Sequence, residues 1–253
     1  MNHVVFTDFD GTVTTKDTLD MIYDRFAFKN WRELYHQWFR EGQRSRQLIK
    51  KLLRECHATE EQFIEILRDI PLRDGFLEFR NFCRKHDYEL IIVSEGIDLS
   101  VKTILHERGI EDIPYYGNTL ARDEHGRWTT THPHGHPECE NCGNCKVWHL
   151  IERKKRGDAV VYIGDGVTDW CPANVADCVF ARKSLADYGA RAGVPLHPFR
   201  DCHDIITVFK SPGFVARIEH DAQFHLDRKV HLPTRHPKTR DQLYAHPLKT
   251  GDT

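Results

Sequence analysis

The fold of this 253-residue chain is decided near its start, by residues 4–14, which read VVFTDFDGTVT. The apolar run before Asp8 is too short for a helix and rich in β-prone residues, so it predicts a buried strand. Gly11 breaks that strand and lets the backbone turn sharply. Asp8 and Asp10 therefore lie at the carboxyl end of the strand, where open α/β sheets bind their ligands.

One residue separates Asp8 from Asp10, so in an extended chain both carboxylates face the same way and address one pocket. Carboxylates that close repel each other unless a proton or a cation lies between them. A hard divalent cation that prefers oxygen ligands, above all Mg²⁺, meets this need. The alternative is a loop in which the two aspartates serve only as a helix cap and for solubility. The strand and the glycine beside them favour the metal site.

The composition is that of a packed globular protein, with 40% hydrophobic and 29% charged residues. A net charge of −2 gives no reason to expect nucleic acid as a partner. No apolar run approaches the roughly 20 residues of a membrane span, so we expect no membrane association. Eight cysteines in a large chain without an export signal favour reduced thiols and a cytoplasmic location. Association into a homodimer stays open.

Residues 17–70 interrupt the alternation of strands and helices with four apolar stripes at helical spacing. They predict four short amphipathic helices in a small bundle, which we interpret as a cap over the active site. The core then comprises residues 1–16 and 71–227. The alternative is that these helices simply pack on the sheet. Residues 228–253 are polar, basic and proline-containing, which predicts a flexible tail.

A second buried strand is predicted over residues 88–93, and it ends in a turn at Ser94, Glu95 and Gly96. The serine hydroxyl and the N–H groups of such a turn can bind phosphate oxygens. A third buried strand, residues 159–163, runs into the acidic turn GDGVTD. The sequence thus places polar turns at the ends of three buried strands.

A cysteine-rich stretch precedes Lys146, with thiols at intervals of three: Cys139, Cys142 and Cys145. This spacing is typical of metal ligands, and a structural Zn²⁺ site requires a fourth ligand. The candidates for that ligand are His132, His134 and His136, of which His136 is nearest in sequence. The alternative is a loop with free thiols.

Four motifs in this order resemble those of the haloacid-dehalogenase-like phosphohydrolases. They are residues 8–14, residues 94–96, Lys146 at the start of an apparent helix, and residues 164–169. They extend over roughly two thirds of the chain, and four ordered motifs are far more specific than one. The resemblance implies an α/β fold: a Rossmann-like three-layer core with a parallel sheet, plus an inserted α-helical cap.

The resemblance also implies roles for single residues. Asp8 would be the nucleophile that forms an aspartyl-phosphate, and Asp10 the acid and base that serves the leaving oxygen and the water. Lys146 would offset the negative charge of the nucleophile and the phosphate, unless it is an ordinary surface lysine. The implied Mg²⁺ ligands are Asp8, Asp10, Asp165 and Asp169, with Asp169 as a direct or an indirect partner.

For the substrate, the resemblance assigns phosphate binding to Ser94, with Glu95 and Gly96 beside it. A helical insertion between the first two motifs is typical of the phosphoserine-phosphatase-like branch. Cysteines directly before the motif lysine are similar to those of methionine-salvage phosphatases, which act on 2-hydroxy-3-keto-5-methylthiopentenyl 1-phosphate. They are also similar to those of phosphoethanolamine/phosphocholine phosphatases, for whose cationic substrates Glu95 could serve.

We therefore expect a Mg²⁺-dependent phosphomonoesterase that acts on a small phosphorylated metabolite, with the methylthiopentenyl phosphate as the first candidate. The enzymatic alternatives are a phosphoserine, a phosphocholine or phosphoethanolamine, and a pyridoxal-phosphate phosphatase. The alternative outside the enzymes is a regulatory protein that binds its partner through the cysteine cluster.

Overall fold

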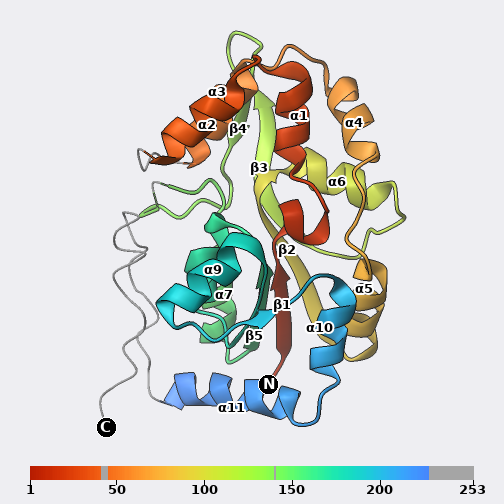
Figure 1. Cartoon of the computed structure of the whole chain (residues 1–253), viewed down its shortest axis with the longest axis vertical. Coiled ribbons are helices and arrows are strands. Elements are labelled where there is room, and N and C mark those ends of the chain that lie inside the picture. Colours follow the sequence, from red (N-terminus) through yellow and green to blue (C-terminus); the bar gives the residue numbers. More distant parts are fainter. Residues whose placement is uncertain (41–44, 140, 228–253) are drawn as a thin grey trace.

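The chain is built around a seven-stranded sheet in the order β4-β3-β2-β1-β5-β6-β7 (Figure 1). The computed structural model describes residues 1–40, 45–139 and 141–227. The strands are β1 (His3–Thr7), β2 (Tyr88–Ile97), β3 (Tyr115–Arg122), β4 (Trp128–Thr131), β5 (Ala159–Gly164), β6 (Cys178–Ala181) and β7 (His197–Pro198). Neighbouring strands are parallel except β3 and β4, which are antiparallel. The expected α/β class with a Rossmann-like parallel sheet is confirmed.

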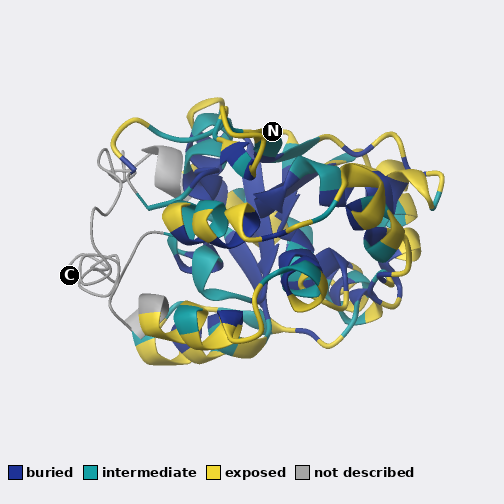
Figure 2. Cartoon of the chain, turned by 90° about the horizontal axis from the view of Figure 1, so that it is seen from above, coloured by how far each residue is buried: buried dark blue, intermediate teal, exposed yellow. Residues whose placement is uncertain are grey.

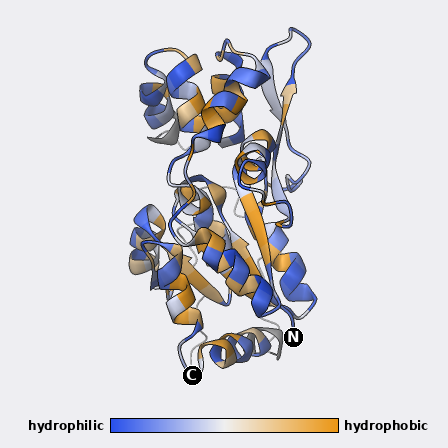
Figure 3. Cartoon of the chain, turned by 90° about the vertical axis from the view of Figure 1, so that its right-hand side faces the viewer, coloured by the Kyte–Doolittle hydropathy of each residue, from blue (hydrophilic) through white to orange (hydrophobic). Residues whose placement is uncertain are grey.

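Strand β1 lies at the centre of the sheet, and its side chains alternate between two apolar layers. Val4 and Phe6 pack on the face covered by α7 (Lys146–Lys155), α8 (Trp170–Ala173) and α9 (Lys183–Ala192). Val5 packs on the other face, against the apolar cluster that contains α5 (Phe76–Lys85), α6 (Asp98–His106) and α10 (Cys202–Phe209). The central strands are therefore buried on both sides, as Figures 2 and 3 show by burial and hydropathy.

Four helices gather beyond the carboxyl end of β1, beside β3 and β4 (Figure 1). They are α1 (Thr18–Phe26), α2 (Trp31–Arg40), α3 (Ser45–Arg54) and α4 (Glu60–Arg68), so the four helices predicted between residues 17 and 70 are confirmed. Thr59 and Gln62 form a reciprocal capping box at the start of α4. Apolar side chains of α1, α3 and α4 join the same cluster as α5 and α10, so these helices are packed firmly against the rest.

At the opposite end of the sheet, α11 (Phe214–Asp227) runs below the start of β1 (Figure 1). Its side chains Phe214, Ile218 and Ala222 are buried in the cluster around α10. None of the described helices combines the length and the apolar character that crossing a bilayer requires. The predicted tail, residues 228–253, lies outside the described residues.

The turn predicted at residues 94–96 is wrong, because β2 continues as a strand to Ile97. Its register against β3 shifts between Val93 and Ile97, which makes this segment an irregularity within the strand. The side-chain amide of Asn118 on β3 donates to the carbonyl oxygen of Glu95 at 2.5 Å. The Asn118 side chain thus replaces a main-chain hydrogen bond between β2 and β3. The residues around Glu95 give no sign of this contact, because Asn118 lies on another strand.

Behind β1 the chain forms one tight, kinked turn, Phe9–Val13, with Gly11 at a φ of 77°. The guanidinium of the buried Arg73 donates to the main-chain carbonyls of Thr12 at 2.7 Å, Gly11 at 2.5 Å and Thr14 at 3.1 Å. The planar fork of arginine suits several fixed acceptors at once. Arg73 therefore holds the turn that follows the two aspartates.

Replacing Arg73 by lysine is expected to lower the free energy of unfolding by about 2 kcal/mol, since an ammonium group leaves some of these buried carbonyls unpaired. Urea unfolding of both proteins measures this loss. Arg68 is the matched control, because it makes only an exposed ion pair with Glu107. Its replacement by lysine should change stability by less than about 0.5 kcal/mol. Equal losses of unfolding free energy for the two substitutions would show that Arg73 does not hold the turn.

Candidate active site

Three side chains from distant parts of the sequence meet at the carboxyl end of β1. Lys146, at the first position of α7, donates from Nζ to Asp8 Oδ1 at 2.5 Å and to Asp169 Oδ1 at 2.7 Å. All three residues are at most 5% exposed. Asp8 continues the sheet, because its N–H donates to the carbonyl of Ile163 on β5 at 2.8 Å. The alternative of a solvated surface lysine at position 146 is therefore wrong.

Asp169 lies in the short helix η2 (Val167–Asp169) after β5, and protein donors surround its carboxylate. Its Oδ1 accepts from Lys146 and from the Tyr162 hydroxyl at 2.5 Å. Its Oδ2 accepts from the N–H groups of Asp165 and Gly166, both at 2.9 Å. Asp169 thus fixes the lysine and the acidic turn at the same time.

Asp8, Asp165 and Asp169 offer carboxylate oxygens that all lie within 4.8 Å of one another. Within the described part of the chain, this is the one group of three or more carboxylate, thiol or imidazole ligands that converges in this way. Burial, and after it the Asp169 carboxylate, raises the pKa of Asp8 and that of Asp165. An all-oxygen set that resists ionisation in this way fits a hard divalent cation such as Mg²⁺.

Two lysines balance part of the negative charge. Burial by itself would lower the pKa of Lys146, but the carboxylates of Asp169 and Asp8 outweigh it and raise that pKa. Lys183 Nζ pairs with Asp165 Oδ2 at 2.7 Å, and its side chain is 55% exposed. The three converging carboxylates therefore outnumber the two lysines that contact them.

Lys183 was not among the residues expected at the site. The signal that could have found it is its place two residues after β6, because the residues that follow parallel strands lie along one edge of the sheet. The structure also places Gly11 against this edge, where a Cβ atom would collide with the carboxylate of Asp165. The glycine is therefore needed for close approach as well as for its positive φ.

Asp10, expected as a fourth metal ligand, is not part of the converging group. Its Oδ1 accepts from the N–H of Thr18 at 2.8 Å, and its Oδ2 accepts from the Ser94 hydroxyl at 3.1 Å. Gly96 lies so close that a Cβ atom there would be 2.7 Å from Asp10 Oδ2. Asp10, Ser94 and Gly96 are thus brought together, beside the Asp8 group and at the start of α1.

Glu95 points away from these residues, toward the cysteine-rich loop. Its Oε1 accepts from the N–H of Gly143 at 2.7 Å, and its Oε2 from the N–H of Asn144 at 3.2 Å. Burial raises the pKa of Glu95 to about 7, although these donors act in the opposite direction. Its carboxylate is therefore engaged by the protein itself.

The expected zinc site receives no support. Cys139 and Cys145 are buried, and the N–H of Cys142 lies 3.4 Å from Cys139 Sγ. His136, however, lies against the ring of Trp148, with centroids 4.4 Å apart, and accepts from the N–H of Glu138. Among the described residues, these thiols and this imidazole do not form a converging ligand group.

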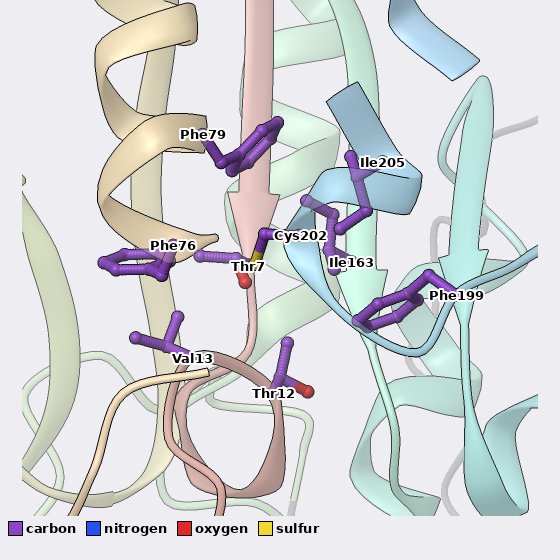
Figure 4. Close-up of a pocket in the computed structure, with 9 residues that line it drawn as sticks. All are labelled: Thr7, Thr12, Val13, Phe76, Phe79, Ile163, Phe199, Cys202 and Ile205. Carbon is purple, nitrogen blue, oxygen red and sulfur yellow. The ribbon is translucent and has the colours of Figure 1, made fainter. Parts of the chain in front are cut away.

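An apolar pocket lies on the face of β1 and β5 that α5 and α10 cover (Figure 4). Its lining includes the rings of Phe76, Phe79 and Phe199. None of the aspartates or lysines discussed above lines it, nor do Cys139, Cys142 and Cys145. It is a packing gap in the core rather than a second candidate for the active site.

Known proteins resemble this chain along most of its length. The profile of the putative phosphatase family matches residues 3–190. A 2-hydroxy-3-keto-5-methylthiopentenyl-1-phosphate phosphatase of Brevibacillus brevis is 34% identical over 212 residues, which cover 82% of this chain and 95% of the relative. A polyol phosphate phosphatase of Saccharomyces cerevisiae is 28% identical, over 82% of this chain and 92% of the relative.

Among solved structures, a phospho-aspartyl intermediate analogue of phosphoserine phosphatase is similar, with a TM-score of 0.63 and 19% identity. The match covers 81% of this chain and 98% of that one, which shows that the two share a fold. The family profile and the relative from Brevibacillus carry the identification further, because both extend over most of the chain. The chain belongs to the putative phosphatase family, and its relatives mark it as a phosphoric monoester hydrolase.

Proposed function

We propose that this phosphatase transfers the phosphoryl group of a small metabolite first to Asp8 and then to water. The observation that carries this proposal is the buried contact of Asp8 with Lys146, beside the carboxylates of Asp165 and Asp169. An anionic nucleophile needs a fixed cation to let a phosphate dianion approach it. Lys146 supplies that cation, because its ammonium contacts Asp8 from the first position of α7.

In the first step, a carboxylate oxygen of Asp8 attacks phosphorus and the bond from phosphorus to the ester oxygen breaks. The leaving oxygen takes a proton from the Asp10 carboxyl group. In the second step, Asp10 accepts a proton from water, whose oxygen attacks phosphorus, and the bond to Asp8 breaks. Ser94 supports this assignment, because its hydroxyl donates a hydrogen bond to the Asp10 carboxylate.

The Mg²⁺ ion of this proposal would be held by Asp8 and Asp165. When bound, it supplies positive charge that lowers the repulsion between the phosphate and the carboxylates. Asp169 serves indirectly, because its two oxygens already accept four hydrogen bonds from the protein. Lys183 balances Asp165 at the exposed rim.

The helices of residues 17–70 would act as the cap that selects the leaving group. Their position beyond the end of β1 supports this role (Figure 1). Among their aromatic side chains, Tyr23 and Trp31 are buried in the apolar core, whereas Tyr35 is 41% exposed. An exposed aromatic ring on the cap would suit a partly apolar group such as a thioether.

The proposed substrate is 2-hydroxy-3-keto-5-methylthiopentenyl 1-phosphate, and the names of three relatives at 30–34% identity support it. A polyol phosphate is the second candidate, because the relative from yeast is named for that substrate class. Both substrates are phosphomonoesters of small, uncharged alcohols or enols. The shared phosphate site cannot tell them apart, so the cap must do so.

Asp8→Asn should reduce kcat by on the order of 10³-fold or more, because an amide cannot attack phosphorus. Asp10→Asn should still react once with p-nitrophenyl phosphate, whose leaving group needs little protonation, and then stop. Intact mass spectrometry would show one phosphoryl group retained on Asp10→Asn and none on Asp8→Asn. Asp112→Asn, which changes an exposed ion pair, is the control and should act as the wild type. A fully active Asp8→Asn protein would overturn the mechanism.

Removal of divalent cations with a chelator should abolish turnover, and added Mg²⁺ should restore it. Because Mg²⁺ lowers the repulsion among buried carboxylates, it should also raise the unfolding temperature of the metal-free protein. Asp165→Asn should weaken this thermal shift, which is measured without substrate. Full activity in metal-free buffer would rule out the metal.

The substrate assignment is tested by kcat/KM for the methylthiopentenyl phosphate, a polyol phosphate, phosphoserine, phosphocholine and phosphoethanolamine. We expect the first to be preferred by at least tenfold, which corresponds to about 1.4 kcal/mol of transition-state stabilisation. A tenfold preference for any other ester would reassign the substrate and leave the phosphatase chemistry intact.

A further inference from the structure

We propose that Glu95 is a positioning residue that fastens helix α3 of the cap to the loop leading into Lys146. The position of helix α3 and the placement of the lysine ammonium beside Asp8 are then set by one buried carboxylate. This inference rests on the proposed function only in giving Lys146 a part in the reaction. The role differs from the substrate contact expected for Glu95 from the sequence.

The first half of the connection joins Glu95 to the loop. Its two oxygens accept from successive main-chain N–H groups, those of Gly143 and Asn144. Glu95 is 8% exposed and Asn144 is fully buried, so without the carboxylate these donors would lose their partner away from water. Each buried donor left unpaired costs about 1–3 kcal/mol. The carboxylate of Glu95 therefore fixes the main chain of the loop at Gly143 and Asn144.

The position of the loop determines that of Lys146, because Lys146 lies only two positions after Asn144 in the sequence. The Asn144 side-chain amide donates to the carbonyls of Ser94 and Tyr116, both at 2.9 Å, which ties the loop to β2 and β3. Its Oδ1 accepts from His149 Nε2 at 2.8 Å, within α7. Lys146 follows two residues later as the first residue of that helix. A shift of the loop would therefore move the ammonium relative to Asp8.

The second half joins the same atoms to the cap. The hydroxyl of Ser45, the first residue of α3, lies 3.0 Å from both Glu95 Oε1 and the carbonyl oxygen of Asn141. The N–H of Ser45 donates to Asn141 Oδ1 at 3.3 Å, and the N–H of Arg46 to the Asn141 carbonyl at 3.2 Å. The loop thus caps the first turn of α3, whose N–H groups have no partners within the helix.

The geometry of Glu95 also disfavours contact with the substrate. Three protein donors occupy its carboxylate, whereas the neighbouring Ser94 turns its hydroxyl to Asp10. A group that binds the leaving alcohol would change the preference among substrates. A positioning residue that acts through Lys146 would change the rate for every substrate alike, because the phosphoryl group is common to all of them.

The test compares Glu95→Gln, Ser45→Ala, the double variant and the control Glu152→Gln, whose carboxylate makes only an exposed pair with Lys155. Each is assayed with p-nitrophenyl phosphate, the methylthiopentenyl phosphate and phosphoethanolamine. An amide presents a donor to one of the two loop N–H groups, so Glu95→Gln should lower kcat about 10- to 100-fold with all three esters and change KM little. Ser45→Ala should lower kcat/KM severalfold alone and by less than twofold in the Glu95→Gln background.

Hydrogen exchange of the amides provides a readout without turnover. Glu95→Gln should speed exchange in peptides that contain Gly143 and Asn144, and Ser45→Ala should speed it at the start of α3. Unchanged amide exchange at Gly143 and Asn144 in Glu95→Gln would disprove the connection between Glu95 and the loop, whatever the activity of the variant. Faster exchange with wild-type kcat, additive effects of the two substitutions, or a loss confined to phosphoethanolamine would disprove positioning through Lys146. An inactive wild type with faster exchange in the variant would instead refute the proposed function.

Discussion

The structure depends on holding several carboxylates together at the end of one central strand. Asp8, Asp165 and Asp169 are all buried, and burial together with the Asp169 carboxylate raises the pKa of Asp8 and that of Asp165. The ammonium of Lys146 offsets part of this repulsion, because it contacts both Asp8 and Asp169. Asp169 in turn accepts a hydrogen bond from the N–H of Asp165, which fixes the turn that carries Asp165. These contacts between opposite charges join the ends of β1 and β5 to the start of α7.

The sequence could predict what depends on local pattern. The apolar run before Asp8, the glycine after it and the helical stripes of residues 17–70 each specify their element through neighbouring residues. The four ordered motifs could assign Lys146 to the site although 138 positions separate it from Asp8, because four such motifs seldom occur in this order by chance. Local pattern thus sufficed for the fold class, and motif order for bringing Asp8 and Lys146 to one place.

Tertiary partners decided the rest, and no local pattern encodes them. Arg73 looks like any polar loop residue until its guanidinium meets the carbonyls behind β1. Ser94 to Ile97 stay in the strand because Asn118, on a neighbouring strand, replaces a missing main-chain hydrogen bond. Asp10 turns from the other aspartates because Thr18 and Ser94 offer it donors. In each case the deciding atom is contributed by another element.

The docking of α3 on the cysteine-rich loop also constrains how such a protein can diversify. Here Ser45 and Asn141 meet across 96 positions of sequence and share their hydrogen bonds with Glu95. A substitution in any one of these three segments must therefore remain compatible with hydrogen bonds that the other two supply.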